Sequence, residues 1–327
     1  MTVPKISVVI VNYRGWETLS ACLDALVSNQ SLPREVIVVD NRSGDGKLGD
    51  FQRRYPSVRF IENAVNAGFA RANNLGASQA RGRYLLFLNP DTVLPEGALD
   101  ALWKAAGHYG EETILSLRQC DLAGREEQVM RAFPSPWSVT FLTRPFYGMW
   151  WRWQHRERCP DDGVVHPEWV SGSLVWIART LFDRLGGWDE RYWLYYEDVD
   201  LCRRARKAGT GIAMLCEPVV LHRHGGTTRR DKRKVAFFKT YVLISRHIYF
   251  SLHYPGLRGI LLQTLLVINN LLIEQLLPAL AGLLLFPLGV ARRYLFIYLY
   301  LVRYYLRAAT LHRWALDPGE LPYGKNG

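Results

Sequence analysis

Short apolar runs alternate with amphipathic segments over the first third of the chain. The runs are rich in Val, Ile, Leu and Phe, as expected of strands that are buried on both faces. They lie at Ile6–Val11, Val36–Val39, Val58–Ile61 and Tyr84–Leu88. The segments between them carry apolar residues at helical spacing and predict helices over Gly15–Ser28, Ala67–Gln79 and Glu96–Ala106. Strands that alternate with helices indicate an α/β fold with a doubly wound, mainly parallel sheet and flanking helices.

The pattern loosens after about residue 110 and becomes regular again near residue 173. We expect a strand over Ser173–Ala178, a helix over Glu197–Lys207 and a strand over Ile212–Leu221. A basic run at 229–234 then precedes a long apolar, helix-forming segment. We therefore predict one α/β domain over 1–225, with halves that meet near residue 110, and a helical region over 226–327.

Composition narrows the class of partner. The 327 residues include 41 Lys and Arg against 30 Asp and Glu, a net charge of +11. This balance favours an anionic partner, such as nucleic acid, a phosphorylated substrate or an acidic membrane surface. The five cysteines are widely separated and form no C-x-x-C pair, so we expect neither a disulfide framework nor a zinc site, consistent with a reducing cytosol. The first residues do not have the layout of a signal peptide.

Polar residues follow directly after the predicted strand Tyr84–Leu88, in the sequence Asn89-Pro90-Asp91-Thr92. Parallel α/β sheets bind ligands beyond the carboxyl ends of their strands. Asp91 is therefore a candidate metal ligand for a substrate that carries phosphates. The same four residues are also typical of an ordinary turn.

Two acids, Glu197 and Asp198, begin the predicted helix Glu197–Lys207. A carboxylate at a helix N-terminus tends to stay ionised and can accept a proton. The alternative is structural, since acids at the start and bases at the end of a helix also match its dipole. Aromatic side chains nearby could supply flat faces for a sugar ring; they include Trp188, Tyr195 and Tyr196.

Two histidines, His222 and His224, follow the last predicted strand of the domain. A neutral imidazole is a good ligand for a transition metal. The alternative is a surface loop with two solvated histidines.

Taken in order, several segments resemble an inverting glycosyltransferase of family two with the GT-A fold, and in particular its rhamnosyltransferase-like branch. The resemblance covers roughly residues 5–228. The segments that carry it are Val8–Tyr13, Val39–Ser43, Asn66–Asn74, Leu88–Thr92, Gly186–Glu190, Tyr196–Asp200 and His222.

The resemblance implies roles for individual residues. Asp91 matches the last Asp of the metal-binding D-x-D motif, with Asn89 in place of the first, and His222 matches the second protein ligand of Mg²⁺ or Mn²⁺, with His224 a poorer candidate. Asp198 matches the catalytic base, and Glu197 is the alternative. Asp40 matches the carboxylate that contacts the nucleotide base. Further positions match the nucleotide-sugar site, namely Val11, Tyr13, Asn66, Gly68, Arg71 and Asn73.

The resemblance also implies a reaction. We expect transfer of L-rhamnose from dTDP-rhamnose to a hydroxyl of a polyprenyl-diphosphate-linked saccharide, in the assembly of a cell-surface polysaccharide. Residues 1–110 would bind the donor and residues 111–225 the acceptor. A UDP- or GDP-hexose donor is the alternative. The sequence leaves open whether the protein forms a homo-oligomer. A nucleic-acid-binding protein or a silent scaffold is the rival, but the basic residues accompany apolar helices rather than a groove of stacking aromatics.

The C-terminal region suggests contact with a membrane. Residues 259–291 contain a single charge, Glu274, and 291–308 form a basic amphipathic helix, so we expect a peripheral or monotopic protein at the cytoplasmic face of the inner or plasma membrane, on its anionic surface. A buried helical hairpin and a re-entrant or spanning hairpin are the alternatives. The aromatic segment Phe146–Arg158 is read in three ways, as an acceptor flap, a packed insertion or a membrane-interface belt.

Overall fold

The computed structural model of the chain describes residues 4–28, 32–127, 130–140, 142–154, 159–223, 232–285 and 289–316. Contacts divide the chain into two compact units. The first consists of Met1–Phe133, Glu157–Glu190 and Glu197–Thr227, and the second of Pro134–Arg156, Arg191–Tyr196 and Thr228–Gly327. The sequence placed a boundary near residue 225; in addition, the segments Pro134–Arg156 and Arg191–Tyr196 belong to the helical unit.

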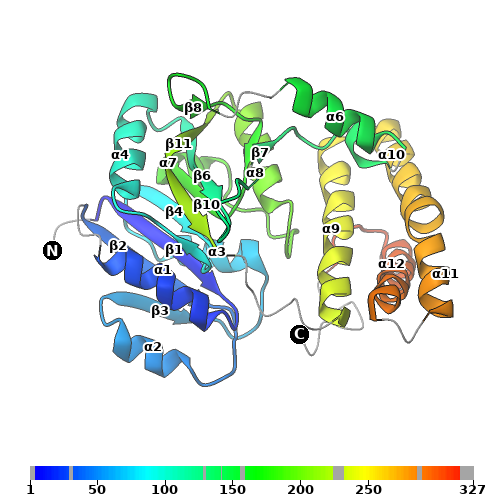
Figure 1. The fold of residues 1–327 in the computed structure, drawn as a ribbon, viewed down its shortest axis with the longest axis horizontal. Helices are drawn as coiled ribbons and strands as arrows, with labels where there is room; N and C mark the ends of the chain where they lie inside the picture. The colour runs from blue at the N-terminus through cyan, green and yellow to red at the C-terminus, as the bar shows by residue number, and fades with distance from the viewer. Residues whose placement is uncertain are drawn as a thin grey trace. The chain divides into compact units, whose positions relative to one another are not determined.

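A mixed, mostly parallel sheet forms the centre of the first unit (Figure 1). Its strands follow the order β3 (Val58–Glu62), β2 (Arg34–Asp40), β1 (Ile6–Asn12), β4 (Tyr84–Leu88), β10 (Leu174–Ala178), β6 (Thr113–Cys120), β11 (Gly211–His222) and β5 (Thr92–Val93), and β8 (Val164–Val165) pairs with β11. β10 runs antiparallel between β4 and β6. The predicted strands are confirmed. β6 was missed because Ser116, Arg118 and Gln119 interrupt its apolar residues.

Helices flank the sheet, namely α1 (Trp16–Ser28), α2 (Leu48–Arg54), α3 (Phe69–Ser78), α4 (Ala98–Tyr109), α7 (Arg179–Arg184) and α8 (Glu197–Lys207). α3 packs against β1 and β2 at very close range. A Cβ atom at Gly76 would lie 2.4 Å from Cγ1 of Val9, so only glycine permits this approach. The loop that begins α3 is thereby held at the carboxyl ends of β1 and β2.

Outside the main sheet, the strands β7 (Met130–Arg131) and β9 (Trp169–Val170) form a small antiparallel pair. A disulfide bond joins Cys159 and Cys216 in the first unit. The sequence predicted no disulfide framework, and this single bond was not expected from it. The two residues are far apart in sequence, and only the fold brings their Cα atoms to 6.1 Å, within the range that a disulfide requires.

The second unit is helical, with α5 (Pro136–Val139), α6 (Arg144–Gln154), α9 (Lys232–His253), α10 (Gly256–Ile268), a π-helical turn over Asn269–Glu274, α11 (Leu276–Leu284) and α12 (Gly289–Leu311). α12 packs against α9 and α11. Within the described residues, one segment, Gly256–Leu284, is long and apolar enough to cross a membrane by length and composition, and 28% of its most apolar window is buried. The segment contains two charged residues, Arg258 near its start and Glu274 in the π-helical turn, and Glu274 pairs with Arg144 at 3.2 Å.

Candidate active site

Asp91 and His222 lie side by side at one edge of the sheet. β5 follows directly after Asp91 and pairs with the end of β11, so that His222 is in register with Thr92. Nε2 of His222 is 3.1 Å from Oδ1 of Asp91, and the backbone N–H of Arg223 donates to the Asp91 carbonyl at 2.8 Å. Two residues 131 positions apart in sequence are thus brought together by one strand pairing.

Glu127 lies behind the imidazole of His222. Its Oε2 atom is 2.9 Å from Nδ1, on the side of the ring opposite Asp91. A carboxylate in this place sets the orientation and tautomer of a histidine whose other nitrogen faces a metal. Burial lowers the pKa of His222, but its contacts with Asp91 and Glu127 outweigh burial and leave the pKa above its ordinary value.

The pair of one carboxylate oxygen and one imidazole nitrogen suits a divalent transition ion such as Mn²⁺ better than Mg²⁺, which prefers oxygen ligands. No group of three or more His, Cys, Asp or Glu side chains is arranged to hold a metal ion within the part of the chain that the structure describes. Asp91 and His222 would supply two protein ligands to such an ion and leave positions for substrate oxygens and water. The alternative ligand His224 lies outside the described residues.

Asp198 is held close to the Asn89–Asp91 loop by a two-residue link. Its Oδ2 atom accepts the backbone N–H of Gly172 at 2.9 Å, and the next residue, Ser173, accepts the backbone N–H of Asn89 at 2.9 Å. A Cβ atom at Gly172 would lie only 3.4 Å from the Cβ of Asp198 and 3.5 Å from the ring of Phe69. The candidate base and the candidate metal loop therefore meet at the same end of β4 and β10.

The two acids at the start of α8 differ in environment. Asp198 keeps partial exposure, and its Oδ1 atom accepts the N–H of Val199 at 2.8 Å. Burial raises the pKa of Asp198, while backbone N–H donors oppose the shift. Glu197 is buried, and its Oε2 atom has no hydrogen-bond partner among the described residues. Burial and the neighbouring Asp198 raise the pKa of Glu197 well above its ordinary value, so this acid favours its neutral form and is the poorer candidate base.

Asn41 organises the loop that precedes α3. Its side-chain amide donates to Oδ1 of Asn66 at 2.9 Å and to the carbonyl of Gly68 at 3.2 Å. Its Oδ1 atom accepts the backbone N–H of Ala67 at 3.0 Å. The predicted donor residues Asn66 and Gly68 are thus held in place by a side chain at the end of β2.

Asp40 lies beside Asn41 at the end of β2, and it is buried. Its carboxylate accepts hydrogen bonds from the amide of Asn12 at 3.3 Å, from the N–H of Ser43 at 3.1 Å and from the hydroxyl of Ser43. Val11 is buried with Val39 and Ala72, whereas Tyr13 is partly exposed with the guanidinium of Arg14 over its ring. Asp40 orders the loop at the sheet edge, and its contact with a nucleotide base stays a prediction.

Three predicted binding residues serve the protein itself in this structure. Asn73 is buried and donates to the carbonyl of Phe69 within α3. Trp188 is fully buried with its ring against Phe69 and Phe87, so the prediction that it contacts an acceptor sugar is wrong. Arg71 is exposed and pairs with Glu190 at 2.9 Å.

Tyr195 and Tyr196 lead directly into α8. Both have positive φ angles, 68° and 70°, which are unfavourable for residues other than glycine and cluster at functional sites. Tyr195 is 39% exposed, while the hydroxyl of Tyr196 accepts a hydrogen bond from Nε of Arg246 at 3.4 Å within the second unit. Of the three predicted acceptor residues, Tyr195 is the most exposed, and its contact with an acceptor stays a prediction.

Sequence reasoning missed Glu127, Asn41 and Gly172. Glu127 lies where the pattern loosens, and nothing local distinguishes it from a surface acid. Asn41 follows directly after Asp40 at a strand end, and that position is a signal that could have identified it. The closeness of Gly172 to Asp198 exists only in three dimensions.

The chain is similar in sequence and in fold to known proteins. The model of the family described as Glycosyl transferase family 2 matches residues 7–158. The chain is similar to an N-acetylglucosaminyl-diphospho-decaprenol L-rhamnosyltransferase of Mycobacterium tuberculosis, with 31% identity over 240 residues, 68% of this chain and 78% of the relative. The rhamnosyltransferase WbbL of Escherichia coli is 28% identical over 186 residues, 54% of this chain and 67% of the relative.

Among solved structures, GalNAc-T7 with UDP, GalNAc and Mn²⁺ matches with a TM-score of 0.54 at 17% identity. The match covers 81% of this chain and 54% of that structure, and it supports the GT-A-like fold alone.

Proposed function

This chain belongs to glycosyltransferase family 2, and from that premise we propose that it transfers L-rhamnose from dTDP-rhamnose to a hydroxyl of a lipid-linked saccharide, with inversion at the anomeric carbon. The observation that carries the proposal is the arrangement of Asp91, His222 and Asp198 at one edge of the sheet. A pair of metal ligands and a partly exposed carboxylate at one site provide what a single displacement on a nucleotide sugar needs.

The reaction that we propose is one displacement. The acceptor hydroxyl gives its proton to the carboxylate of Asp198 as its oxygen forms a bond to the anomeric carbon. The bond from that carbon to the phosphate oxygen breaks, and its electron pair leaves with the nucleoside diphosphate. Burial, which raises the pKa of Asp198, makes this carboxylate a stronger base than an exposed Asp.

Asp91 and His222 would hold a divalent ion at the diphosphate, with Glu127 fixing the ring of His222. When bound, such an ion supplies positive charge that stabilises the departing diphosphate. The residues of this chain would place the donor by the Asn41-ordered loop of Asn66 and Gly68, next to the start of α3.

The relatives support the choice of rhamnose as the donor sugar and of a lipid-linked saccharide as the acceptor. Both the Mycobacterium tuberculosis and the Escherichia coli proteins are rhamnosyltransferases, and the name of the first gives an acceptor with a decaprenyl diphosphate. We propose the same class for this chain, a saccharide on a polyprenyl diphosphate in cell-surface polysaccharide assembly. The alternative is a UDP- or GDP-hexose donor.

A screen of nucleotide sugars tests the donor. The purified full chain is incubated with Mn²⁺ and with dTDP-L-rhamnose, UDP-hexoses or GDP-hexoses, and release of the nucleoside diphosphate is measured. We expect release from dTDP-L-rhamnose, loss of that release in excess EDTA, and loss in a matched Asp91→Ala variant. Release only from a UDP- or GDP-hexose would refute the assignment of rhamnose as the donor sugar. A product with retained anomeric configuration would refute the single inverting displacement.

We also propose that the second unit holds the protein at the cytoplasmic face of the inner or plasma membrane. Large apolar side chains are exposed along α11, among them Leu277, Leu280 and Leu284, and α12 carries arginines suited to anionic lipids. Flotation with vesicles that contain phosphatidylglycerol tests this. Equal flotation of the full chain and of a chain that ends at residue 227 would refute a role for the second unit.

A further inference from the structure

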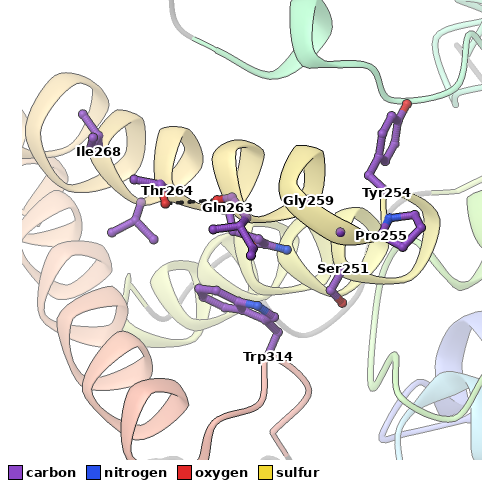
Figure 2. A pocket seen from close by; sticks show the side chains of 11 residues that line it. Ser251, Tyr254, Pro255, Gly259, Gln263, Thr264, Ile268 and Trp314 are labelled. Atoms are coloured by element: carbon purple, nitrogen blue, oxygen red, sulfur yellow. Dashed lines mark hydrogen bonds between the residues drawn. The ribbon is translucent and has the colours of Figure 1, made fainter.

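The second unit contains a groove along α10, with a volume of about 460 Å³ (Figure 2). Tyr254 and Pro255 lie at one end and Ile268 at the other, while Trp314 faces α10 from the opposite side. The remaining lining residues are Ser251, Gly256, Gly259, Ile260, Gln263, Thr264 and Val267. Its size lies within the range of pockets that bind small molecules.

The chemistry of the lining favours an apolar ligand over a charged one. No Asp, Glu, Lys or Arg contributes to the lining. The hydroxyl of Ser251 donates to the carbonyl of Ile248 at 2.7 Å, and that of Thr264 donates to the carbonyl of Ile260 at 3.0 Å. Gln263 is engaged with both the backbone and the ring of His247. Ser251, Thr264 and Gln263 thus already donate to the protein, and most of the lining left to a ligand is apolar.

The residue behind Gln263 carries no charge at neutral pH. His247 is fully buried, and burial lowers its pKa to about 4. His247 therefore offers no positive charge to a phosphate or carboxylate, whereas a hydrocarbon chain needs none.

The groove is continuous with an exposed apolar face of the same helix. Ile260 lines the groove and is 64% exposed. Leu257 precedes it by three positions and is exposed as well, so the two side chains are neighbours on the helix surface. Leu257 and Ile260 thus extend the apolar surface of the groove along α10, with the exposed Arg258 between them in sequence.

One helix, α9, joins the groove to the segment that leads into the catalytic helix. The hydroxyl of Ser245 donates to the carbonyl of Leu194 at 2.8 Å, and Arg246 donates to the hydroxyl of Tyr196 at 3.4 Å. Ser251, on the next turns of α9, lines the groove. At ~1.5 Å per residue, the contact with Tyr196 and the groove are separated by only about 8 Å along the helix axis.

We propose that the groove along α10 binds the hydrocarbon chain of the lipid-linked acceptor, next to the end of the chain that carries the diphosphate and the saccharide. This inference rests on the proposed function, because it takes the lipid-linked acceptor from there. An acyl chain of a membrane phospholipid and residues 317–327 of this chain are the competing occupants. The sequence of that C-terminal segment is largely polar and therefore a poor match to the groove.

A photoreactive analogue of farnesyl diphosphate, with a diazirine at the far end of its chain, tests the groove in the full-length protein without turnover. The crosslinked peptide is identified by mass spectrometry, and affinity is measured by competition with unlabelled farnesyl diphosphate. We expect labelling of residues 251–268 and at least tenfold weaker binding in Ile260→Trp, which fills the groove.

Leu261→Trp is the matched control, because Leu261 is 61% exposed on the same helix and does not line the groove. Unchanged binding there, within twofold, supports the inference. Equal weakening in both variants, or in neither, overturns it. Displacement of the probe by lysophosphatidylglycerol as readily as by farnesyl diphosphate assigns the groove to phospholipid. Tenfold tighter binding after truncation at Leu316 assigns it to the C-terminal segment, and either result overturns the inference.

The two proposals fail separately. Absence of nucleoside diphosphate release from every donor by the wild-type chain refutes the proposed function. Normal release together with labelling outside α9 and α10 refutes the groove alone.

Discussion

Glu197 and Asp198, the first two residues of α8, allow the roles of neighbouring acids to be separated by paired substitutions. Asp198→Asn keeps the size of the side chain and removes its ability to accept a proton. Glu197→Gln replaces a buried acid, whose pKa is raised well above its ordinary value, by a neutral side chain of the same shape. We expect opposite outcomes, loss of transfer in the first variant and its retention in the second.

The magnitude for Asp198→Asn follows from its contacts. Loss of a general base lowers the rate by a factor of roughly 10² to 10⁴, or about 3 to 5 kcal/mol in activation free energy. Asp198 also accepts the N–H groups of Gly172 and Val199 at 2.9 and 2.8 Å. In the variant, the asparagine oxygen can keep one of these two hydrogen bonds. Its NH₂ group then faces the other N–H donor, which lowers the free energy of unfolding by about 1–3 kcal/mol.

Glu197→Gln should not lower stability at neutral pH. Because the pKa of Glu197 is raised in the folded state, its contribution to stability is present below the unfolded-state pKa and is lost as the pH rises through the folded-state pKa. Glutamine removes this loss, so the variant should unfold at an equal or higher temperature at pH 7 and with a weaker dependence on pH.

The assay combines initial rates of transfer with thermal unfolding between pH 5 and pH 8 for the wild type and both variants. Transfer in Glu197→Gln should stay within several-fold of the wild type. A loss in Glu197→Gln as large as that in Asp198→Asn would refute the separation of roles, as would normal turnover in Asp198→Asn.

Four further predictions concern the same site. Asp91→Ala should weaken Mn²⁺-dependent donor binding at least tenfold in calorimetry, whereas Asp198→Ala should leave it nearly intact; equal losses would mean that the two roles are assigned wrongly. Because burial raises the pKa of Asp198 and its carboxylate must be ionised to accept a proton, transfer should be lost as the pH falls, with a midpoint above the ordinary value of 3.8; a rate that stays flat down to pH 4 contradicts this. Glu127→Gln should raise the Mn²⁺ concentration for half-maximal activity about 10- to 100-fold with little change in kcat at saturating Mn²⁺, whereas a purely structural role would lower Tm without changing the metal dependence. Trp188→Ala should destabilise the fold by about 3–5 kcal/mol in denaturant unfolding, while the exposed Tyr195→Ala should change stability by less than about 1 kcal/mol and raise the KM for acceptor; the reverse order would restore Trp188 as a binding residue.

The strands of the first unit could be predicted from local pattern, and the prediction for β4, Tyr84–Leu88, matches its observed bounds. A continuous apolar run buried on both faces has few alternatives to a central strand. β6 was not predicted because polar residues interrupt its apolar pattern. The burial of Ser116 and Gln119 depends on neighbours that are distant in sequence.

The site was predicted unevenly. Resemblance named Asp91, His222 and Asp198, and the structure brings Asp91 and His222 together and ties Asp198 to the same edge. It also named Trp188 and Asn73, which the structure buries within the protein. An aromatic or amide side chain has the same local signature whether it faces a ligand or the core, because the surrounding packing decides between them.

The amino-acid sequence by itself determined the order of strands and helices, the excess of basic groups and the residue types available for catalysis, since these depend on composition and short-range period. Only the tertiary structure decided which of those residues meet. The Cys159–Cys216 bond, the carboxylate of Glu127 behind His222 and the groove along α10 each join segments far apart in the chain. Such contacts arise from strand pairing and helix packing, in which the position of each residue depends on all the others, and no local pattern contains that information.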